Sequence, residues 1–154
     1  MSKSESNNSI EQMTLFKTPE ESPGYLLWRI SNSWKTSIEE VLKPLNLTHP
    51  QFVILATTAW LTRNNKHVNQ IDISKTSGLD PTTTSQVLRG LEAKDFITRI
   101  RSLNERNKNP KLTILGNNVL SKAIPTVENA DAKFFGSLNI QSMNELIKTF
   151  QELI

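Results

Sequence analysis

The sequence predicts a mainly α-helical protein that carries one small β-hairpin. Two patterns support this fold class. Apolar residues recur at steps of three and four along most of the chain, as they do on one face of a helix. Between residues 96 and 114 the pattern changes to the alternation that is typical of β-strands. With 154 residues, of which 36% are hydrophobic, the chain is long enough for one domain with its own core.

The composition excludes several kinds of chemistry. The chain has no cysteine, which excludes disulfides, thiolate metal sites, cysteine nucleophiles and thiol redox switches. His49 and His67 fit capping or surface positions better than a metal site, so we expect no metal and no cofactor. No apolar run approaches the roughly 20 residues that span a bilayer, and the start MSKSESNNSIEQ lacks the segments of a signal peptide. We therefore expect a cytoplasmic protein without membrane contact.

The N-terminal part is expected to hold a tail and one long helix. Residues 1–21 are polar and rich in Ser, Asn and Glu, which is typical of a mobile tail. Residues 22–154 are expected to form a single domain. An apolar stripe predicts a helix over residues 23–45, which Pro44 ends. The stripe consists of Leu27, Ile30, Trp34, Ile38, Val41 and Leu45.

Capping residues mark the next three helices, which are expected over residues 48–63, 69–78 and 80–94. The first residue of each pattern is a good N-cap: Thr48, Asn69 and Asp80. Pro50 and Pro81 suit the first helical turn, and Gly78 is a natural left-handed helix end. The apolar stripe of the helix after Thr48 is Phe52, Leu55, Ala56, Ala59 and Trp60.

A hairpin and two further helices complete the chain. The segments FITRIRSL and KLTI are extended in pattern, and NERNKN between them is a polar turn with basic residues. Thr113 can cap a helix that continues to Phe134 and Phe135, and Pro125 is expected to kink or split it. The last helical stripe is Met143, Leu146, Ile147, Phe150, Leu153 and Ile154.

Positive charge is concentrated in one third of the chain. The whole chain has a net charge of +3, but residues 61–111 hold ten basic and five acidic residues, a net charge of +5. The remaining eight basic and ten acidic residues give −2. A local basic surface is expected of a protein that binds nucleic acid. A solvated loop rich in Lys and Arg would give the same count.

The order of the middle elements is helix, turn, helix and wing, where the wing is the basic hairpin. In such an arrangement the second helix enters the major groove of DNA. A projection of residues 81–93 places Val87, Leu88 and Leu91 on one face, with Thr84 beside them, and the opposite face carries Thr82, Gln86 and Arg89. Gln suits adenine, Arg suits guanine, and the flanking Thr83 and Ser85 suit phosphate oxygens. An ordinary solvated helix face is the alternative, although TTTSQ is a poor helix former.

The wing supplies a second set of candidate DNA contacts. Arg99 and Arg101 are expected on one strand face. Arg106 is the candidate for insertion into a narrow minor groove, whose negative potential favours arginine. Lys108 and Lys111 are the candidates for phosphate contacts.

From about Leu27 onwards the sequence resembles the MarR family of winged helix-turn-helix transcriptional regulators. The resemblance rests on THPQFVIL, on VNQIDISKTSGLDPTTTSQVLRGLEAKDFITR, and on the wing ending in LT shortly before Gly116. It implies a winged helix-turn-helix unit over about residues 48–114, with dimerisation helices over about 23–45 and 115–154. It also implies a homodimer on a pseudo-palindromic operator, often as a repressor that a small ligand releases. The family's recognition positions fall on Thr82, Thr83, Thr84, Ser85 and Gln86, and its wing arginine falls on Arg106.

Four residues depart from the family pattern. Asn104 stands where the family has an Asp that braces the wing arginine, so a weaker hydrogen bond is expected there. Gln86 often corresponds to Arg, which alters the expected base preference. Asp95 replaces a usual Gly and is tolerable because Asp accepts the left-handed region. Pro110 removes a strand N–H from the wing.

Long apolar stripes at both chain ends also favour dimerisation, because together they exceed what the small winged core can cover. Capping of a monomer's core is the alternative. Trp28, Trp34 and Trp60 are candidates for a pocket that binds a small aromatic ligand, and core or dimer packing is their alternative role.

Two other functional classes are alternatives to a DNA-binding regulator. An enzyme is not expected, since the sequence shows neither a Ser, His and Asp set with recognisable spacing nor a Gly-rich phosphate loop. A winged-helix module that binds a protein instead of DNA is the second hypothesis. It predicts an association that is insensitive to salt and to Arg106.

Overall fold

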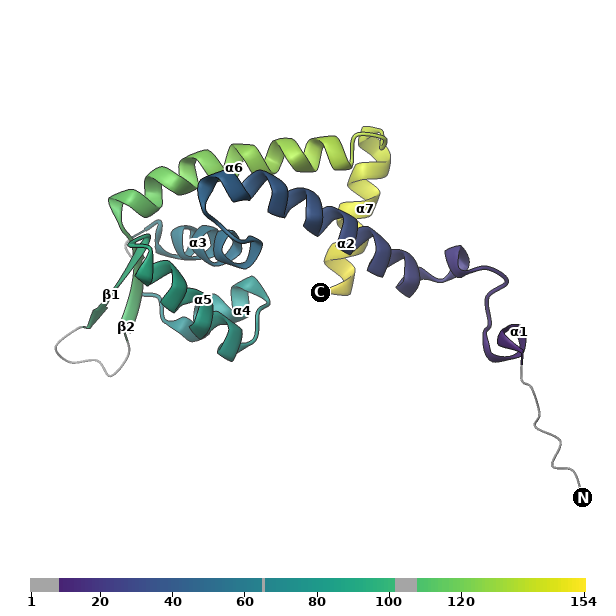
Figure 1. The fold of residues 1–154 in the computed structure, drawn as a ribbon, viewed down its shortest axis with the longest axis horizontal. Helices are drawn as coiled ribbons and strands as arrows, with labels where there is room; N and C mark the ends of the chain where they lie inside the picture. Colours follow the sequence, from purple (N-terminus) through teal and green to yellow (C-terminus); the bar gives the residue numbers. More distant parts are fainter. Residues whose placement is uncertain (1–8, 65, 102–107) are drawn as a thin grey trace, which may run out of the picture. The chain divides into compact units, whose positions relative to one another are not determined.

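The computed structural model describes residues 9–64, 66–101 and 108–154. The chain divides into two compact units, Met1–Thr36 and Ser37–Ile154. The expected tail over residues 1–21 and the expected single domain over residues 22–154 stay predictions beside this division at residue 36. In chain order (Figure 1) the elements are α1 (Ile10–Met13), η1 (Pro19–Glu21), α2 (Pro23–Leu42), η2 (Lys43–Leu45), α3 (His49–Thr62), α4 (Gln70–Ser77), α5 (Pro81–Ala93), β1 (Ile97–Arg101), β2 (Lys108–Leu112), α6 (Ile114–Phe134) and α7 (Ile140–Leu153).

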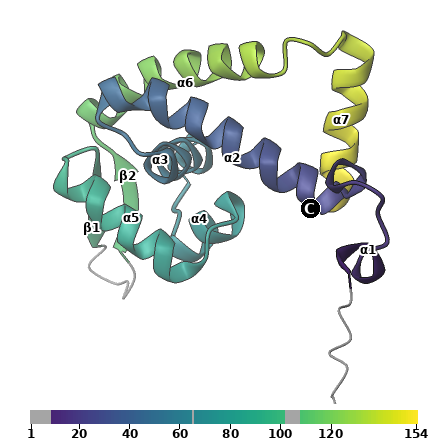
Figure 2. The same ribbon diagram turned by 45° about the vertical axis from the view of Figure 1, so that its right-hand side comes forward.

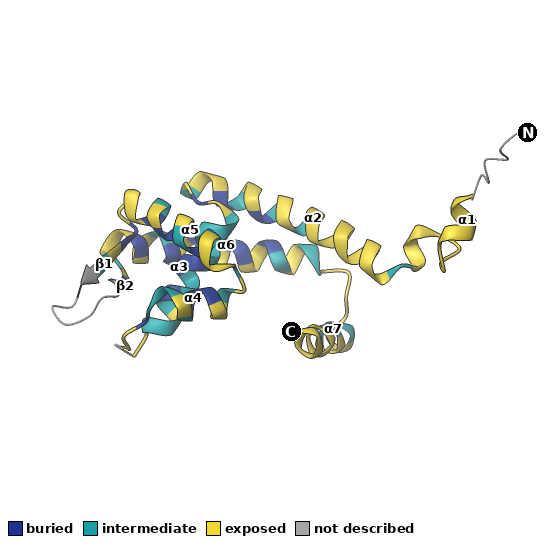
Figure 3. Cartoon of the chain, turned by 90° about the horizontal axis from the view of Figure 1, so that it is seen from below, coloured by how far each residue is buried: buried dark blue, intermediate teal, exposed yellow. Residues whose placement is uncertain are grey.

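The larger unit is built around α3, which contacts α4, α5, α6 and β2 (Figures 1 and 2). The core comprises the buried aliphatic residues that these elements and the end of α2 direct inward (Figure 3), namely Ile38, Leu42, Ile54, Leu55, Ile73, Leu88, Leu91, Ile97, Leu120, Ala123 and Val127. Because α3 has neighbours on several sides, its expected single stripe is only partly correct. Ile54, Leu55 and Thr58 are buried, whereas Trp60 is 62% exposed.

The predicted N-caps are confirmed by their hydrogen bonds. The side chains of Thr48, Asn69 and Asp80 accept from the backbone N–H groups three residues later, and Thr113 does the same at α6. The predicted helix end at Gly78 is also confirmed, with a φ of 74°. These interactions are local, so the sequence pattern was sufficient to predict them.

The two strands form an antiparallel pair in which Ile97 lies opposite Leu112 and Arg101 opposite Lys108. The predicted hairpin is confirmed, but its second strand begins earlier than expected. Lys108 and Asn109, which the pattern placed in the turn, belong to β2. Of the expected strand segment KLTI, only Lys111 and Leu112 belong to β2. Thr113 is the N-cap of α6, and Ile114 is the first residue of that helix.

The helix around Pro125 was expected to be kinked or split, and of these alternatives the structure excludes the split. Pro125 does not split the helix that contains it, since α6 runs unbroken from Ile114 to Phe134. Pro125 and Ser121, whose carbonyl loses its helical donor, are both exposed, so water can satisfy that carbonyl. The expected tail contains α1 and η1, and the N–H of Lys17 donates to the Glu21 carboxylate at 2.9 Å.

Candidate nucleic-acid interface

The turn between α4 and α5 is fixed by hydroxyl groups. The carbonyl of Leu79 accepts from Ser74 Oγ at 2.7 Å and from Thr84 Oγ1 at 3.4 Å. The Nε2 of Gln70, at the start of α4, donates to the Pro81 carbonyl at 3.4 Å. These bonds join both helices of the pair to one turn, so α5 is held in a defined orientation relative to α4.

The outward face of α5 carries the residues predicted to read base edges. Thr82, Gln86 and Arg89, hereafter the reading stripe, are all exposed. The opposite face holds Leu88 and Leu91, both with 0% exposure. The helix therefore presents a hydroxyl, an amide and a guanidinium on one side while its other side is anchored in the core. Such donors and acceptors pair with the edges of adenine and guanine in the major groove.

Thr84 is a correction to the predicted site. The resemblance places it among the DNA-contacting positions, but its side chain is 0% exposed and its hydroxyl bonds to Leu79. The reason is helical periodicity, since position 84 is one turn before Leu88 on the buried face. Thr84 therefore fixes the helix pair and does not reach DNA.

The first turn of α5 is occupied by its own cap. Thr83 donates its backbone N–H to Asp80 Oδ1 at 2.9 Å and its hydroxyl to Asp80 Oδ2 at 2.5 Å. These bonds, that of the Thr83 hydroxyl above all, lower the pKa of Asp80 below its ordinary value of 3.8. Thr83 and Ser85 are half-buried. The hydroxyl of Thr83 thus forms part of the helix cap. The sequence predicted only a phosphate contact for this residue.

The wing is attached directly to the end of α5. The N–H groups of Asp95 and Phe96 donate to the carbonyls of Glu92 and Leu91, both at 3.0 Å, which closes α5 with a Schellman motif. Asp95 occupies the left-handed position of that motif with a φ of 58°, as the sequence predicted. Thr113, just after β2, donates its hydroxyl to the Asp95 carbonyl at 2.6 Å. The end of α5, the base of the wing and the start of α6 therefore meet at one point.

Arg99 is a second correction. It was predicted to face DNA from the wing, but its side chain is only 12% exposed, and its Nε lies 3.3 Å from Glu92 Oε2 on α5. The alternation of the strand explains the difference, because Arg99 shares a face with Ile97, which is 1% exposed. Among the described residues, its Nε and Nη2 have no hydrogen-bond partner. Arg99 therefore joins the wing to α5.

Of the other predicted wing residues, some lie in the two strands and some lie outside the described residues. Arg101 and Lys108 lie opposite each other at the open end of the two strands, and Lys111 is exposed. Asn104 and Arg106 lie outside the described residues. Pro110, opposite Arg99, is fully buried, so the residue that lacks a strand N–H contributes to packing.

The three tryptophans fall into different parts of the chain. Trp28, which is 67% exposed, and Trp34, which is half-buried, belong to the unit Met1–Thr36. Trp60 belongs to the larger unit, where Arg63 stacks on its ring with the guanidinium carbon 3.8 Å from the ring centroid. Arg63, one of the ten basic residues between positions 61 and 111, thus makes a cation–π contact within the chain.

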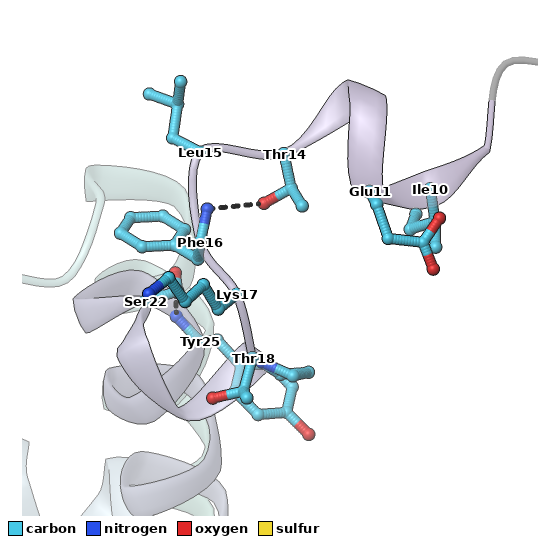
Figure 4. Close-up of a pocket in the computed structure, with 10 residues that line it drawn as sticks. Ile10, Glu11, Thr14, Leu15, Phe16, Lys17, Thr18, Ser22 and Tyr25 are labelled. Atoms are coloured by element: carbon cyan, nitrogen blue, oxygen red, sulfur yellow. Dashed lines mark hydrogen bonds between the residues drawn. The ribbon is translucent and has the colours of Figure 1, made fainter.

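A hollow of about 840 Å³ lies in the N-terminal unit (Figure 4). It is formed by α1, by the segment after it and by the start of α2, and Phe16 and Tyr25 supply its aromatic lining. The Phe16 N–H donates to Thr14 Oγ1 at 3.2 Å, which shapes the loop between α1 and η1. None of the residues predicted as functional lines this hollow.

Comparison with known proteins identifies the family and tests the fold. The sequence model of the MarR family matches residues 47–108, which run from the N-cap region of α3 into the wing. The uncharacterized HTH-type transcriptional regulator YdcH of Bacillus subtilis is 31% identical over 153 residues, which cover 94% of this chain and 98% of the relative. The chain belongs to the MarR family.

Solved MarR-family structures have the same fold. CouR from Rhodococcus jostii RHA1, solved with p-coumaroyl-CoA, has a TM-score of 0.78 and 22% identity, and the match covers 90% of this chain and 95% of CouR. The Mycobacterium tuberculosis MarR family protein Rv2887, solved with DNA, has a TM-score of 0.65 and 26% identity. That match covers 86% of this chain and 97% of Rv2887. The mainly α-helical fold with a hairpin wing, predicted from the sequence, is confirmed.

Within the described residues, no group of three or more His, Asp or Glu side chains could hold a metal ion. None of the described helices is both long and apolar enough to cross a membrane.

Proposed function

We propose that this protein is a homodimeric repressor that binds double-stranded DNA and reads a pseudo-palindromic operator. The observation that carries the proposal is the reading stripe, three exposed polar side chains on a helix whose other face is buried. Gln86 and Arg89 supply bidentate groups for base edges, and Thr82 supplies a hydroxyl near the helix N-terminus. Rv2887, a MarR family protein solved with DNA, is described as a transcriptional repressor, which supports the same role here.

The wing would contact the adjacent minor groove. Arg106 is the candidate for insertion, with Asn104 beside it, and Arg101, Lys108 and Lys111 are candidates for phosphate contacts. The pairing of Arg101 with Lys108 puts two cationic residues at the open end of the strands. This end leads into the segment that holds Arg106.

A second copy of the chain would cover the apolar faces of the terminal helices. Within the described chain, no residue of α7 is buried, although the helix carries Ile140, Ile147, Phe150 and Leu153. The early part of α2 likewise exposes Leu27, Trp28 and Ile30. Large exposed apolar surfaces mark protein interfaces. A symmetric dimer would place two α5 helices about one turn of DNA apart, ~34 Å.

A small aromatic ligand would release the repressor. CouR, with the same fold, is solved with p-coumaroyl-CoA, which carries an aromatic group. Trp28, Trp34 and Trp60 remain the candidates for contact with such a ligand. Since the chain has no cysteine, its inducer does not act by oxidising a thiol. The protein would act in the cytoplasm and would not be an enzyme.

Selection of bound duplexes from a genomic library tests this function. We expect one preferred sequence with two half-sites about one helical turn apart. The logarithm of affinity should fall steeply with the logarithm of salt concentration, and Arg106→Ala should weaken operator binding. No preferred sequence, together with an affinity that does not change with salt, would instead support a winged-helix module that binds protein.

A further inference from the structure

Lys94, the C-cap residue of α5, is hydrogen-bonded to residues that are distant in the sequence. Its ammonium Nζ donates to the Asn46 carbonyl at 2.7 Å and to Gln51 Oε1 at 2.8 Å. Asn46 closes η2 and Gln51 belongs to the first turn of α3. The charge is therefore satisfied inside the chain by two neutral oxygens, although the sequence counts Lys94 among the basic residues of the DNA-binding region.

Gln51 is itself held in place. Its Oε1 also accepts from the Thr48 N–H at 3.2 Å, and its N–H donates back to Thr48 Oγ1 at 3.3 Å, so it forms part of the α3 capping box. Its Nε2 lies 3.2 Å from where a Cβ on Gly90 would stand. A side chain at position 90 would therefore press on the Gln51 amide, which would have to shift by a few tenths of an ångström.

We propose that Lys94 and Gln51 are positioning residues that set how α5 is presented to DNA. The inference rests on the proposed function and names the residues that make its reading stripe effective. Lys94 lies twelve residues from Thr82, which is roughly 18 Å along a helix, so a tilt of about 5° at Lys94 moves Thr82 by roughly 1.5 Å. Hydrogen bonds to base edges do not tolerate such a shift, whereas phosphate attraction does. We call the bonds from Lys94 to Gln51 and to the Asn46 carbonyl the brace. Loss of the brace should therefore reduce the preference for the operator and leave non-specific binding intact.

The test uses the full-length protein and the operator recovered by the genomic selection. Affinities of the wild type and of Lys94→Met, Gln51→Leu and the double variant are measured against the operator and a scrambled duplex over a salt series. All measurements are made well below each variant's melting temperature. We expect Lys94→Met to weaken operator binding about tenfold and scrambled binding little, with an unchanged salt slope. The losses in operator affinity of the two single variants should not add up in the double variant, because both single changes remove the bond between Lys94 and Gln51.

Three matched variants separate a brace from a phosphate contact. Gln51→Glu keeps an acceptor for Lys94 and should retain operator affinity. Lys122→Met removes an exposed lysine of α6 and should change neither affinity. Lys111→Met should weaken both duplexes equally and lower the salt slope by about 0.9. If Lys94→Met behaves like Lys111→Met, or changes operator affinity less than twofold, the positioning role is wrong.

A DNA-free measurement keeps this inference distinct from the proposed function. If the wild type itself selects no sequence, the proposed function fails. Hydrogen exchange then tests, without DNA, whether Lys94 secures the end of α5. In Lys94→Met the amides of Asp95 and Phe96, which close α5, should exchange about fivefold faster than in the wild type. Unchanged exchange at both amides would show that Lys94 does not secure the end of the helix.

Discussion

Gly116 lies so close to Phe96 that a Cβ at position 116 would stand 1.9 Å from the Phe96 carbonyl oxygen. The same carbonyl accepts from the Thr113 N–H at 3.1 Å. The first turn of α6 is therefore pressed against the residue that joins α5 to β1, and only glycine allows this approach. The obstacle is backbone, which cannot move aside as a flexible side chain would.

Gly116→Ala should destabilise the fold by about 3 kcal/mol, since overpacking that displaces backbone is among the costlier core changes. Urea denaturation measures the effect. Gly24→Ala is the matched control, because a Cβ there meets nothing within 4 Å. Gly24 is the second residue of α2, where that change should be neutral or stabilise by up to about 1 kcal/mol. Equal stability of the two variants would contradict the close approach.

Gln86→Ala should lower operator affinity by about 1–3 kcal/mol and relax base preference at one position of each half-site. The reason is that its exposed amide is expected to pair with a base edge, most readily adenine. Binding to a set of operators with single base changes measures the effect. Lys122→Ala, which alters an exposed residue of α6 outside the proposed interface, should leave the base preference as it is. A uniform loss over all duplexes in Gln86→Ala would assign the residue to the phosphates.

Glu92→Ala should destabilise the protein by about 1–3 kcal/mol, because it leaves the largely buried guanidinium of Arg99 without its ion pair. The loss should exceed that of Glu152→Ala at the exposed end of α7. A double-mutant cycle with Arg99→Leu measures the coupling through the free energy of unfolding. Strictly additive losses would show that the pair contributes nothing.

Asp80 should make the stability of α5 dependent on pH. The bond from the Thr83 hydroxyl, and then that from its backbone N–H, lower the pKa of Asp80 in the folded state below the ordinary 3.8. Its stabilising contribution is therefore complete above pH 3.8 and is lost as the pH falls through the lower folded value. The difference in unfolding free energy between the wild type and Asp80→Asn should shrink between pH 6 and pH 3. A difference that stays constant over this range would refute the assignment.

Phe150→Glu should convert the dimer into a monomer, because it places a charge on the apolar face of α7 that a second copy is proposed to cover. Sedimentation velocity measures the change in mass. Gln151→Glu adds the same charge at the next position, which is exposed and polar, and should leave the dimer intact. A wild type that sediments as a monomer would exclude the dimer outright.

Features set by a few neighbouring residues were predictable from the sequence. The caps at Thr48, Asn69, Asp80 and Thr113 and the left-handed ends at Gly78 and Asp95 depend on local bonds and backbone preferences, and all are confirmed. The outward direction of the reading stripe also followed, because helical periodicity separates Thr82, Gln86 and Arg89 from the buried Leu88 and Leu91.

Features that depend on distant residues were not predictable in the same way. The sequence predicted Arg99 to be a DNA contact, because the alternation of the strand does not tell which of its faces is buried. The burial of Ile97 shows that the face shared with Arg99 is the inward one. Lys94 counted as part of the basic surface, since nothing near it in sequence indicates Asn46 or Gln51, which lie 48 and 43 residues away. Charge alone cannot distinguish a cation that meets DNA from one that holds the fold together.

The junction at Phe96 also constrains how operators can change during evolution. The end of α5 is closed by Phe96, and the start of α6 is fixed to the same residue by Thr113 and Gly116. The end of α5, which carries the reading stripe, and the base of the wing are thus joined to the start of α6 through one residue. In the proposed complex with DNA, substitutions in the reading stripe would exchange one preferred base for another, whereas a new spacing between the α5 contacts and the wing contacts would require a wing of different length. Related regulators should therefore diverge in base identity more readily than in half-site geometry.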